Sequence, residues 1–164
     1  MADTKSMQGK NGDSSLQKAS SEFSKKLLPQ TKLEKKLEDI LNAFRREEIT
    51  REKAKEQLAK FESDELKKLL TQRLSDSYYI IRRFSIEYFA EHDYSVLFKQ
   101  LSLELPAHVR IEITACLVKT IKSAEDADEA VKAISECLKH TREPAVASFL
   151  ENSREKLSAL LPKQ

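Results

Sequence analysis

The stretch YYIIRRFSIEYFA, residues 78–90, decides the fold. It is apolar over most of the circumference of a helix, and only Arg83 and Glu87, spaced to form an ion pair, mark a polar edge. A helix of this kind is buried on several sides. Arg82 nevertheless lies within its apolar surface, and Arg110 lies in the same way within another apolar segment. A charged side chain that recurs inside apolar surface predicts a stacked helical array with internal ion pairs, and not an active site.

The composition of the chain favours an all-α protein. The chain has 164 residues, enough for one domain with a buried core. It contains two glycines, both within the first twelve positions, and four prolines, so residues typical of β-hairpin turns are scarce. Leu, Lys, Glu and Ala, which are good helix formers, are abundant. We therefore expect a single all-helical domain over residues 31–164.

Residues 1–30 differ from the rest of the chain and are expected to form a flexible basic tail. Their first part is polar, contains both glycines and has no hydrophobic periodicity, which is typical of disorder. Further on, Leu16, Phe23 and Leu27 fall on one face of a short amphipathic helix that Pro29 would end. This segment is either a recognition helix that folds into the groove of a partner or a weak helix that frays or docks on its own domain.

Hydrophobic periodicity divides the domain into helical segments. Thr50 is placed to cap one of them, and Pro144, a favoured residue of the first turn, begins the last. The central segments are apolar on two sides and the last on a single side, which is the gradient expected of stacked helix pairs closed by a terminal helix. The expected helices are 32–46, 50–61, 63–74, 78–90, 94–105, 107–122, 126–139 and 144–161.

Residues 64–161 resemble HEAT-like repeats. In that family the second helix of each pair tends to begin with a small apolar residue followed by arginine, after an acidic residue in the preceding turn. Here Asp76 precedes the pair Ile81–Arg82, and the next unit has Val109–Arg110. The resemblance implies a short right-handed α-solenoid of antiparallel helix pairs.

The resemblance also implies a structural role for the two arginines. In HEAT-like proteins such aspartates and arginines tend to form a ladder between neighbouring repeats, so Arg82 and Arg110 would be ladder residues, with Asp76 and Asp93 as candidate partners. Each arginine needs a partner, because an unpaired buried charge is costly. The third unit has Ala147 in place of the arginine, and an irregular helical bundle with no true repeat is the alternative architecture.

The sequence contains no motif that indicates catalysis, a cofactor or a metal ion. None of the three histidines stands in a metal-binding spacing such as HExxH, and no glycine follows residue 12 to form a phosphate-binding loop. The two cysteines, Cys116 and Cys137, fall on apolar helix faces and are expected to be packed free thiols. We therefore expect a protein that is not an enzyme. Certain chromophore lyases resemble HEAT-like proteins, so a lyase-like enzyme is an alternative, although no residue supports it.

The expected function is protein–protein interaction, as an adaptor or regulatory module. Stacked helix pairs expose a groove lined by their second helices. The mixture of charge signs in this groove suits a polar peptide or protein surface better than a polyanion. The residues expected in the partner-binding groove are Arg83, Glu87, His108, Glu112 and Lys119.

Binding of the nucleic-acid backbone through the basic N-terminal half is the alternative function. The net charge of the chain is +2, and the first 60 residues contain 14 Lys and Arg against 10 Asp and Glu. Acidic side chains interleave with the basic ones and dilute the positive field, which falls well short of that of a dedicated nucleic-acid binder. The candidate residues are Lys25, Lys26, Lys32, Lys35, Lys36, Arg45, Arg46 and Arg51.

The sequence also lacks signals for export or membrane insertion. No segment has the charged start and apolar core of a signal peptide. No apolar run approaches the length that spans a bilayer. We therefore expect a soluble, cytoplasmic protein without a membrane partner.

Overall fold

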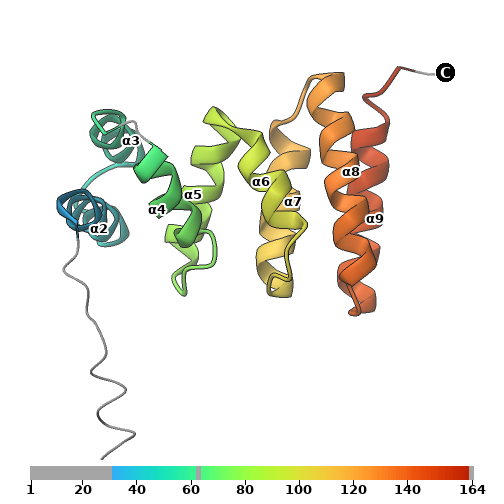
Figure 1. Ribbon diagram of the computed structural model, residues 1–164, viewed down its shortest axis with the longest axis horizontal. Coiled ribbons are helices and arrows are strands. Elements are labelled where there is room, and N and C mark those ends of the chain that lie inside the picture. Colours follow the sequence, from blue (N-terminus) through green and yellow to red (C-terminus); the bar gives the residue numbers. More distant parts are fainter. Residues whose placement is uncertain (1–30, 62–63, 163–164) are drawn as a thin grey trace, which may run out of the picture. The chain divides into compact units, whose positions relative to one another are not determined.

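A computed structural model describes residues 31–61 and 64–162. These residues form eight α-helices and no strand, which confirms the prediction of an all-α protein (Figure 1). From Leu33 onward the helices belong to the second of two units into which the chain divides. The expected tail over residues 1–30, with its helix face of Leu16, Phe23 and Leu27, lies outside the described residues. The helices are α2 (Lys32–Arg45), α3 (Arg51–Ala59), α4 (Asp64–Arg73), α5 (Tyr79–His92), α6 (Tyr94–Leu101), α7 (Ala107–Thr120), α8 (Ala124–His140) and α9 (Pro144–Ser158).

The helix boundaries lie close to the predicted ones, with one exception. Thr50 caps α3 as predicted, because its hydroxyl accepts a hydrogen bond from a backbone amide in the first turn, at 3.2 Å. The exception is α6, which ends at Leu101, a full turn before Pro106. The Ser102 hydroxyl donates to the Lys99 carbonyl at 2.7 Å. This side-chain bond satisfies a terminal carbonyl of the helix, so the helix ends there without a proline.

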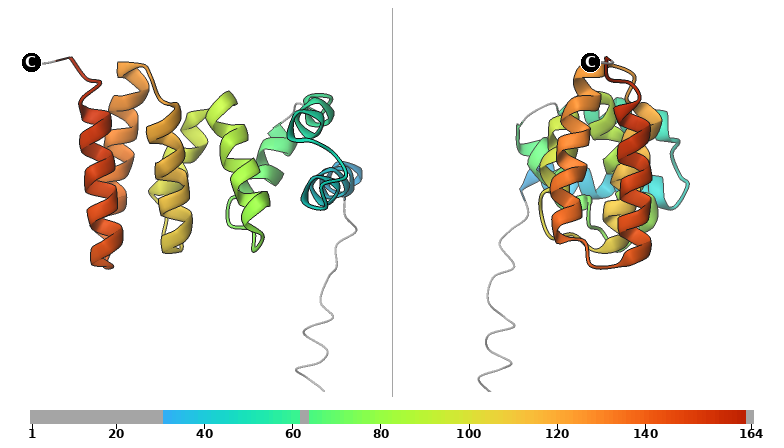
Figure 2. Two further views of the ribbon diagram at one scale, coloured as in Figure 1. Left: turned by 180° about the vertical axis from the view of Figure 1, so that it is seen from behind. Right: turned by 90° about the vertical axis from the view of Figure 1, so that its right-hand side faces the viewer.

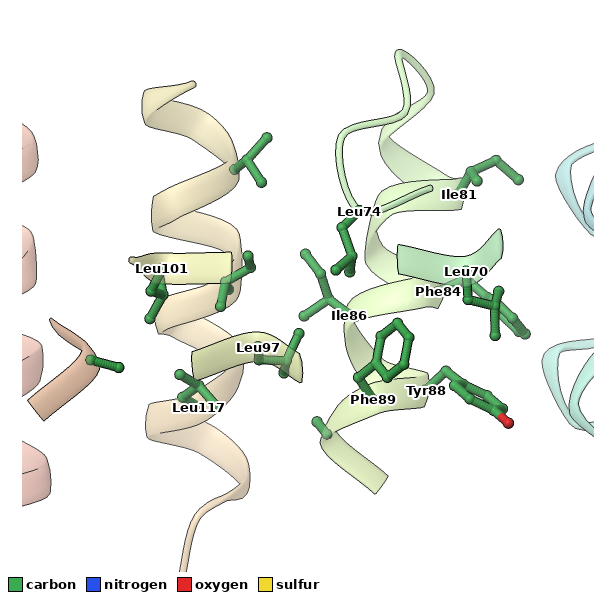
Figure 3. Packing of buried hydrophobic residues seen from close by; sticks show 14 of the residues in the cluster. Leu70, Leu74, Ile81, Phe84, Ile86, Tyr88, Phe89, Leu97, Leu101 and Leu117 are labelled. Atoms are coloured by element: carbon green, nitrogen blue, oxygen red, sulfur yellow. The ribbon is translucent and has the colours of Figure 1, made fainter. Parts of the chain in front are cut away.

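Helix α5 is buried on several sides, as its apolar circumference predicted. Phe84 faces α2, where the centre of its ring lies 5.0 Å from that of Phe44. Ile86 points in the opposite direction, toward α7 (Figure 3). Both side chains are almost fully buried, and burial of a side chain of this size stabilises a fold by roughly 1.5–3 kcal/mol. The helix therefore connects the packing on its two sides.

The helices from α4 onward pack as successive neighbours. Helix α7 contacts both α5 and α9, and α6 contacts α8. Within the pairs, α4 contacts α5, α6 contacts α7, and α8 contacts α9. Figures 1 and 2 show α8 and α9 side by side and antiparallel, joined by a short loop. Each helix pair thus makes its main contacts with the pair next to it.

Arg82 and Arg110 are buried and connect one helix pair with the next. Arg82, with 8% of its surface exposed, donates to both carboxylate oxygens of Glu112, at 2.9 and 2.7 Å. Arg110, with 7% exposed, donates to Glu143 at 3.0 Å and to the Thr141 hydroxyl at 2.6 Å. Each buried guanidinium therefore has a partner, which offsets the cost of removing its charge from water.

The acidic partners of the arginines differ from those that the HEAT-like resemblance implied. Asp76 supplies its backbone carbonyl to Arg82 at 2.9 Å, while its carboxylate accepts from the Tyr78 amide at 2.9 Å. Asp93 caps α6 and pairs with Lys67 at 3.3 Å, and not with an arginine. The physical reason is that each arginine extends toward the following helix pair. The two aspartates lie just before helices, where a carboxylate satisfies the free amides of the backbone.

Candidate functional site

A pocket of about 510 Å³ opens between α5 and α7, and its size is typical of ligand-binding clefts. We call it the α5–α7 pocket. Ile86 contributes to it from α5 and points toward α7 (Figure 3). The pocket is lined by Arg51 of α3, by Tyr79, Arg83, Ile86, Glu87 and Glu91 of α5, and by Ile111, Glu112, Ala115, Cys116, Lys119 and Thr120 of α7.

Helical periodicity arranges the lining side chains in rows. On α5, Tyr79, Arg83 and Glu87 follow one another at intervals of four residues, which places them along one side of the helix. On α7, Ile111 and Ala115 stand at the same interval. Side chains that project from two packed helices keep a fixed spacing, which is an advantage for a binding site.

Two arginines converge on Glu87 within the pocket. Arg83 donates to one carboxylate oxygen at 2.9 Å, as the spacing of four residues predicted, and Arg51 donates to the other. One turn further along α5, Glu91 pairs with Lys55 at 2.5 Å. These ion pairs join α3 to α5, so the two carboxylates on this side of the pocket are already neutralised.

The α7 side of the pocket contains one paired carboxylate and one cation without a partner. Glu112 is the carboxylate that binds the buried Arg82 through both oxygens. Lys119 is exposed and forms no ion pair with any residue that the structure describes. The pocket therefore combines apolar surface, three neutralised carboxylates and one cation that is free to bind a ligand.

The structure brings together most of the groove residues that the sequence predicted. Four of them line the pocket, and His108 does not. His108 lies exposed in the first turn of α7, four residues before Glu112. The Glu112 carboxylate turns to Arg82 because a bidentate bond to a guanidinium is stronger than a single bond to an imidazole. The four that line the pocket are Arg83, Glu87, Glu112 and Lys119.

Sequence reasoning missed several lining residues. A signal existed for Tyr79 and Glu91, because both continue the row of Arg83 and Glu87 at intervals of four residues. No local signal existed for Arg51, which precedes its partner in α5 by 36 residues. The tertiary packing of the helices brings Arg51 to the pocket, and helical periodicity carries no information about that packing.

The pocket also contains a thiol, that of Cys116. Burial raises its pKa to about 11, and the negative charge of Glu87 acts in the same direction. The thiol is therefore protonated at neutral pH and is a poor nucleophile. Both cysteines were predicted to be packed, and Cys137 is buried, but Cys116 is half-buried because it borders the pocket.

The histidines and acidic residues of the described chain form no cluster suited to a metal. His92, at the end of α5, stacks on Tyr88 with ring centres 4.2 Å apart, and its Nδ1 lies 2.8 Å from the Tyr88 carbonyl oxygen. In residues 31–61 and 64–162, no three His, Cys, Asp or Glu side chains gather where they could hold a metal ion. Among the described helices, none has the length and apolar character needed to cross a membrane.

A second pocket, of about 260 Å³, lies beside Arg110. Its lining includes Cys137, His140, Arg142 and Glu143. Backbone hydrogen bonding at the start of α9 lowers the pKa of Glu143, and the bond from Arg110 lowers it further. Arg110 and Glu143 are thus engaged in the ion pair that joins α7 to the turn before α9.

The cations considered for nucleic-acid binding are partly engaged within the protein. The Arg45 guanidinium lies 4.1 Å from the ring centre of Tyr78, and the Lys36 ammonium lies 4.9 Å from that of Phe61. Arg51 is held in the ion pair with α5. The ion pair offsets the positive charge of Arg51, whereas the two ring contacts hold Lys36 and Arg45 in place without removing their charges. Two of the candidates lie outside the described residues: Lys25 and Lys26.

Comparisons of the chain with protein-family models, with curated proteins and with solved structures found no match. The resemblance to HEAT-like repeats therefore depends on the residues that carry it. Any functional inference must come from the geometry and chemistry of the α5–α7 pocket itself.

Proposed function

We propose that this protein is a non-enzymatic interaction module, an adaptor or regulator, that binds a peptide or protein surface in the α5–α7 pocket. One observation carries the proposal: an apolar cleft between two packed helices is bordered by charged side chains. A few polar groups around an apolar interior are typical of a binding site, since the interior supplies affinity and the border supplies orientation.

The proposed architecture is a short right-handed α-solenoid of HEAT-like antiparallel helix pairs. It is supported by the contacts of each helix pair with its neighbour. It is also supported by Arg82 and Arg110, which form ion pairs with the following helix pair. Such arrays present the second helices of successive pairs side by side, and the cleft between two of them is a common place for a partner to bind.

The chemistry of the pocket favours binding over catalysis. The Cys116 thiol has a raised pKa and is protonated at neutral pH. The carboxylates of Glu87 and Glu112 are each held by arginine, so neither binds a further group without giving up an ion pair. The pocket offers a partner the side chains of Ile111 and Ala115 for apolar contact, with charged side chains around them.

An affinity experiment tests this site. The full chain is immobilised, extract from the cells of origin is passed over it, and retained proteins are identified by mass spectrometry. Ala115→Trp fills the pocket from α7 with a large side chain, so we expect it to abolish retention of the partner. His108→Trp places the same side chain on the same helix outside the lining, and we expect it to retain the partner.

Circular dichroism melting accompanies both variants. Ala115 is exposed, so the tryptophan occupies the cleft and does not enter the core, and we expect the melting temperature to change little. Equal retention by wild type and by folded Ala115→Trp would show that the partner binds elsewhere, and the proposed site would be wrong.

A further inference from the structure

We infer that the occupant of the α5–α7 pocket is an acidic peptide segment, with a large apolar side chain that enters the cleft and a neighbouring carboxylate that pairs with Lys119. This inference rests on the proposed function and specifies the chemistry of the partner. It follows from a comparison between the charged side chains around the pocket that already have an ion-pair partner and the one that has none among the described residues.

The carboxylates around the pocket leave no opportunity for a basic ligand. Glu87 accepts hydrogen bonds from two arginines, Glu91 pairs with Lys55, and Glu112 binds Arg82 through both oxygens. A ligand cation would have to displace one of these partners before it gained an ion pair. Displacing Arg82 would also leave a buried guanidinium without its carboxylate, which is strongly unfavourable.

The cations around the pocket exceed the carboxylates. Five basic side chains stand in or directly behind the lining, against three acidic ones. Lys119 is the one that has no acidic partner among the residues described. A ligand carboxylate can therefore bind Lys119 without breaking an existing ion pair. The basic side chains are Arg51, Lys55, Arg82, Arg83 and Lys119.

The position of Lys119 sets the spacing of the ligand groups. Ile111, Ala115 and Lys119 follow one another at intervals of four residues along α7, and one helical turn advances by about 5.4 Å. A side chain seated on Ile111 and Ala115 thus lies one to two turns from the ammonium group. This distance matches an apolar residue and a carboxylate that are two positions apart on one face of an extended peptide, or one turn apart in a helical one.

A polyanion fits the pocket less well than such a peptide. Backbone binding to nucleic acid needs several free cations in a row, because affinity grows with the number of phosphates neutralised. Here one free cation stands beside three carboxylates and apolar surface. A phosphate chain would find a single free cation and would leave the apolar part of the cleft uncovered.

A random peptide library displayed on phage tests the inference with the full chain as bait. Enriched peptides are synthesised with a fluorescent label, and their affinity is measured by anisotropy. We expect enriched sequences to place Asp or Glu within a turn of a large apolar residue. Lys119→Glu should weaken binding about fivefold, which corresponds to an exposed ion pair worth about 1 kcal/mol. Ala115→Trp should abolish binding.

The control is Lys122→Glu, which removes an exposed cation just beyond the end of α7 and outside the lining. It changes the net charge as Lys119→Glu does, and it should alter affinity by less than about twofold, because Lys122 lies outside the lining and its exposed charge is screened by solvent. A charge exchange gives the sharpest result: a peptide whose key Asp is replaced by Lys should bind Lys119→Glu better than it binds wild type.

The failures of the two proposals are distinguishable. Peptides that bind Ala115→Trp as well as wild type would overturn both the site and its occupant. Peptides that lose binding to Ala115→Trp but contain no acidic residue, or ignore Lys119→Glu, would overturn the acidic occupant alone. A single-stranded oligonucleotide that binds wild type, and that Lys119→Glu abolishes, would reassign the pocket to a polyanion. A library that yields no binder counts against both proposals.

Discussion

At the scale of single residues, the two buried arginines show what a sequence pattern can and cannot predict. Their positions within apolar segments predicted an internal location, since helical periodicity is a local property of the chain. The carboxylates that bind them differ from the predicted aspartates, although Asp76 does accept a hydrogen bond from Arg82 through its backbone carbonyl. Glu112 and Glu143 lie about thirty residues further along and reach the arginines only when the helix pairs pack together. The tertiary structure therefore determines which carboxylate pairs with each arginine.

The Arg82–Glu112 pair is expected to be a major contributor to stability. Arg82→Leu leaves the Glu112 carboxylate, with 19% of its side chain exposed, without its cation. It also removes the donor to the carbonyls of Asp76 and Ser77. We expect the free energy of unfolding, measured by urea titration, to fall by about 3 kcal/mol.

Two further variants separate the buried charge from its neighbours. Arg83→Leu removes an adjacent arginine whose side chain is 48% exposed, and a loss below about 1 kcal/mol is expected for such a surface pair. Arg82→Leu combined with Glu112→Leu should recover much of the lost stability, because no unpaired charge stays buried. If Arg82→Leu and Arg83→Leu lower the free energy of unfolding by similar amounts, the buried Arg82–Glu112 pair contributes no more to stability than an exposed pair.

At the scale of the helix, local sequence signals predicted where a helix begins better than where it ends. They also predicted which residues share one face of a helix better than which residues of other helices that face contacts. Thr50 was recognised as a cap because its type and position suffice. The early end of α6 was missed, because a serine that bonds back to the helix is not distinct in sequence from any other serine. Intervals of four residues likewise placed Arg83 and Glu87 on one face, whereas Arg51 joined them only through packing.

The cap of α6 predicts a dependence of stability on pH. Hydrogen bonds from Ser95, followed by the pairing with Lys67, lower the pKa of Asp93 from its ordinary value of 3.8. A carboxyl whose pKa is lower in the folded state stabilises the protein above its unfolded pKa, and this contribution is lost as the pH falls through the folded pKa. Asp93→Asn retains a capping side chain but cannot ionise.

We therefore expect Asp93→Asn to melt below wild type at neutral pH, with a difference that shrinks toward zero as the pH falls below 3.8. Thermal melts of both proteins across the acid range measure the difference. Asp128→Asn removes a carboxylate that pairs with Lys132 on exposed surface, and it is the control for the loss of one negative charge. A difference for Asp93→Asn that is constant with pH would mean that the cap does not depend on ionisation.

At the scale of the whole molecule, the main helix contacts run between neighbours. Helix α9 packs on α7 and α8, and α4 packs on α5. In a stack of this kind, stability is approximately a sum of intrinsic terms and nearest-neighbour terms. In an irregular bundle around one core, a defect anywhere lowers the stability of every helix together. The response to a local defect therefore distinguishes the proposed solenoid from the bundle.

Hydrogen exchange on the full chain measures that response. Leu150 in α9 is fully buried, and Leu150→Ala should cost about 3 kcal/mol by opening a cavity. For a stack, we expect amide protection to fall in α9 and α8, less in α7, and not at all in α4 and α5. Leu70→Ala removes an equally buried leucine from α4. It should produce the opposite pattern, in which α4 and α5 lose protection and α9 is unchanged.

A uniform loss of protection in both variants would mean that the helices unfold as one unit. The α5–α7 pocket would then be a cleft in a single bundle, and the proposal of successive repeats would have to be withdrawn.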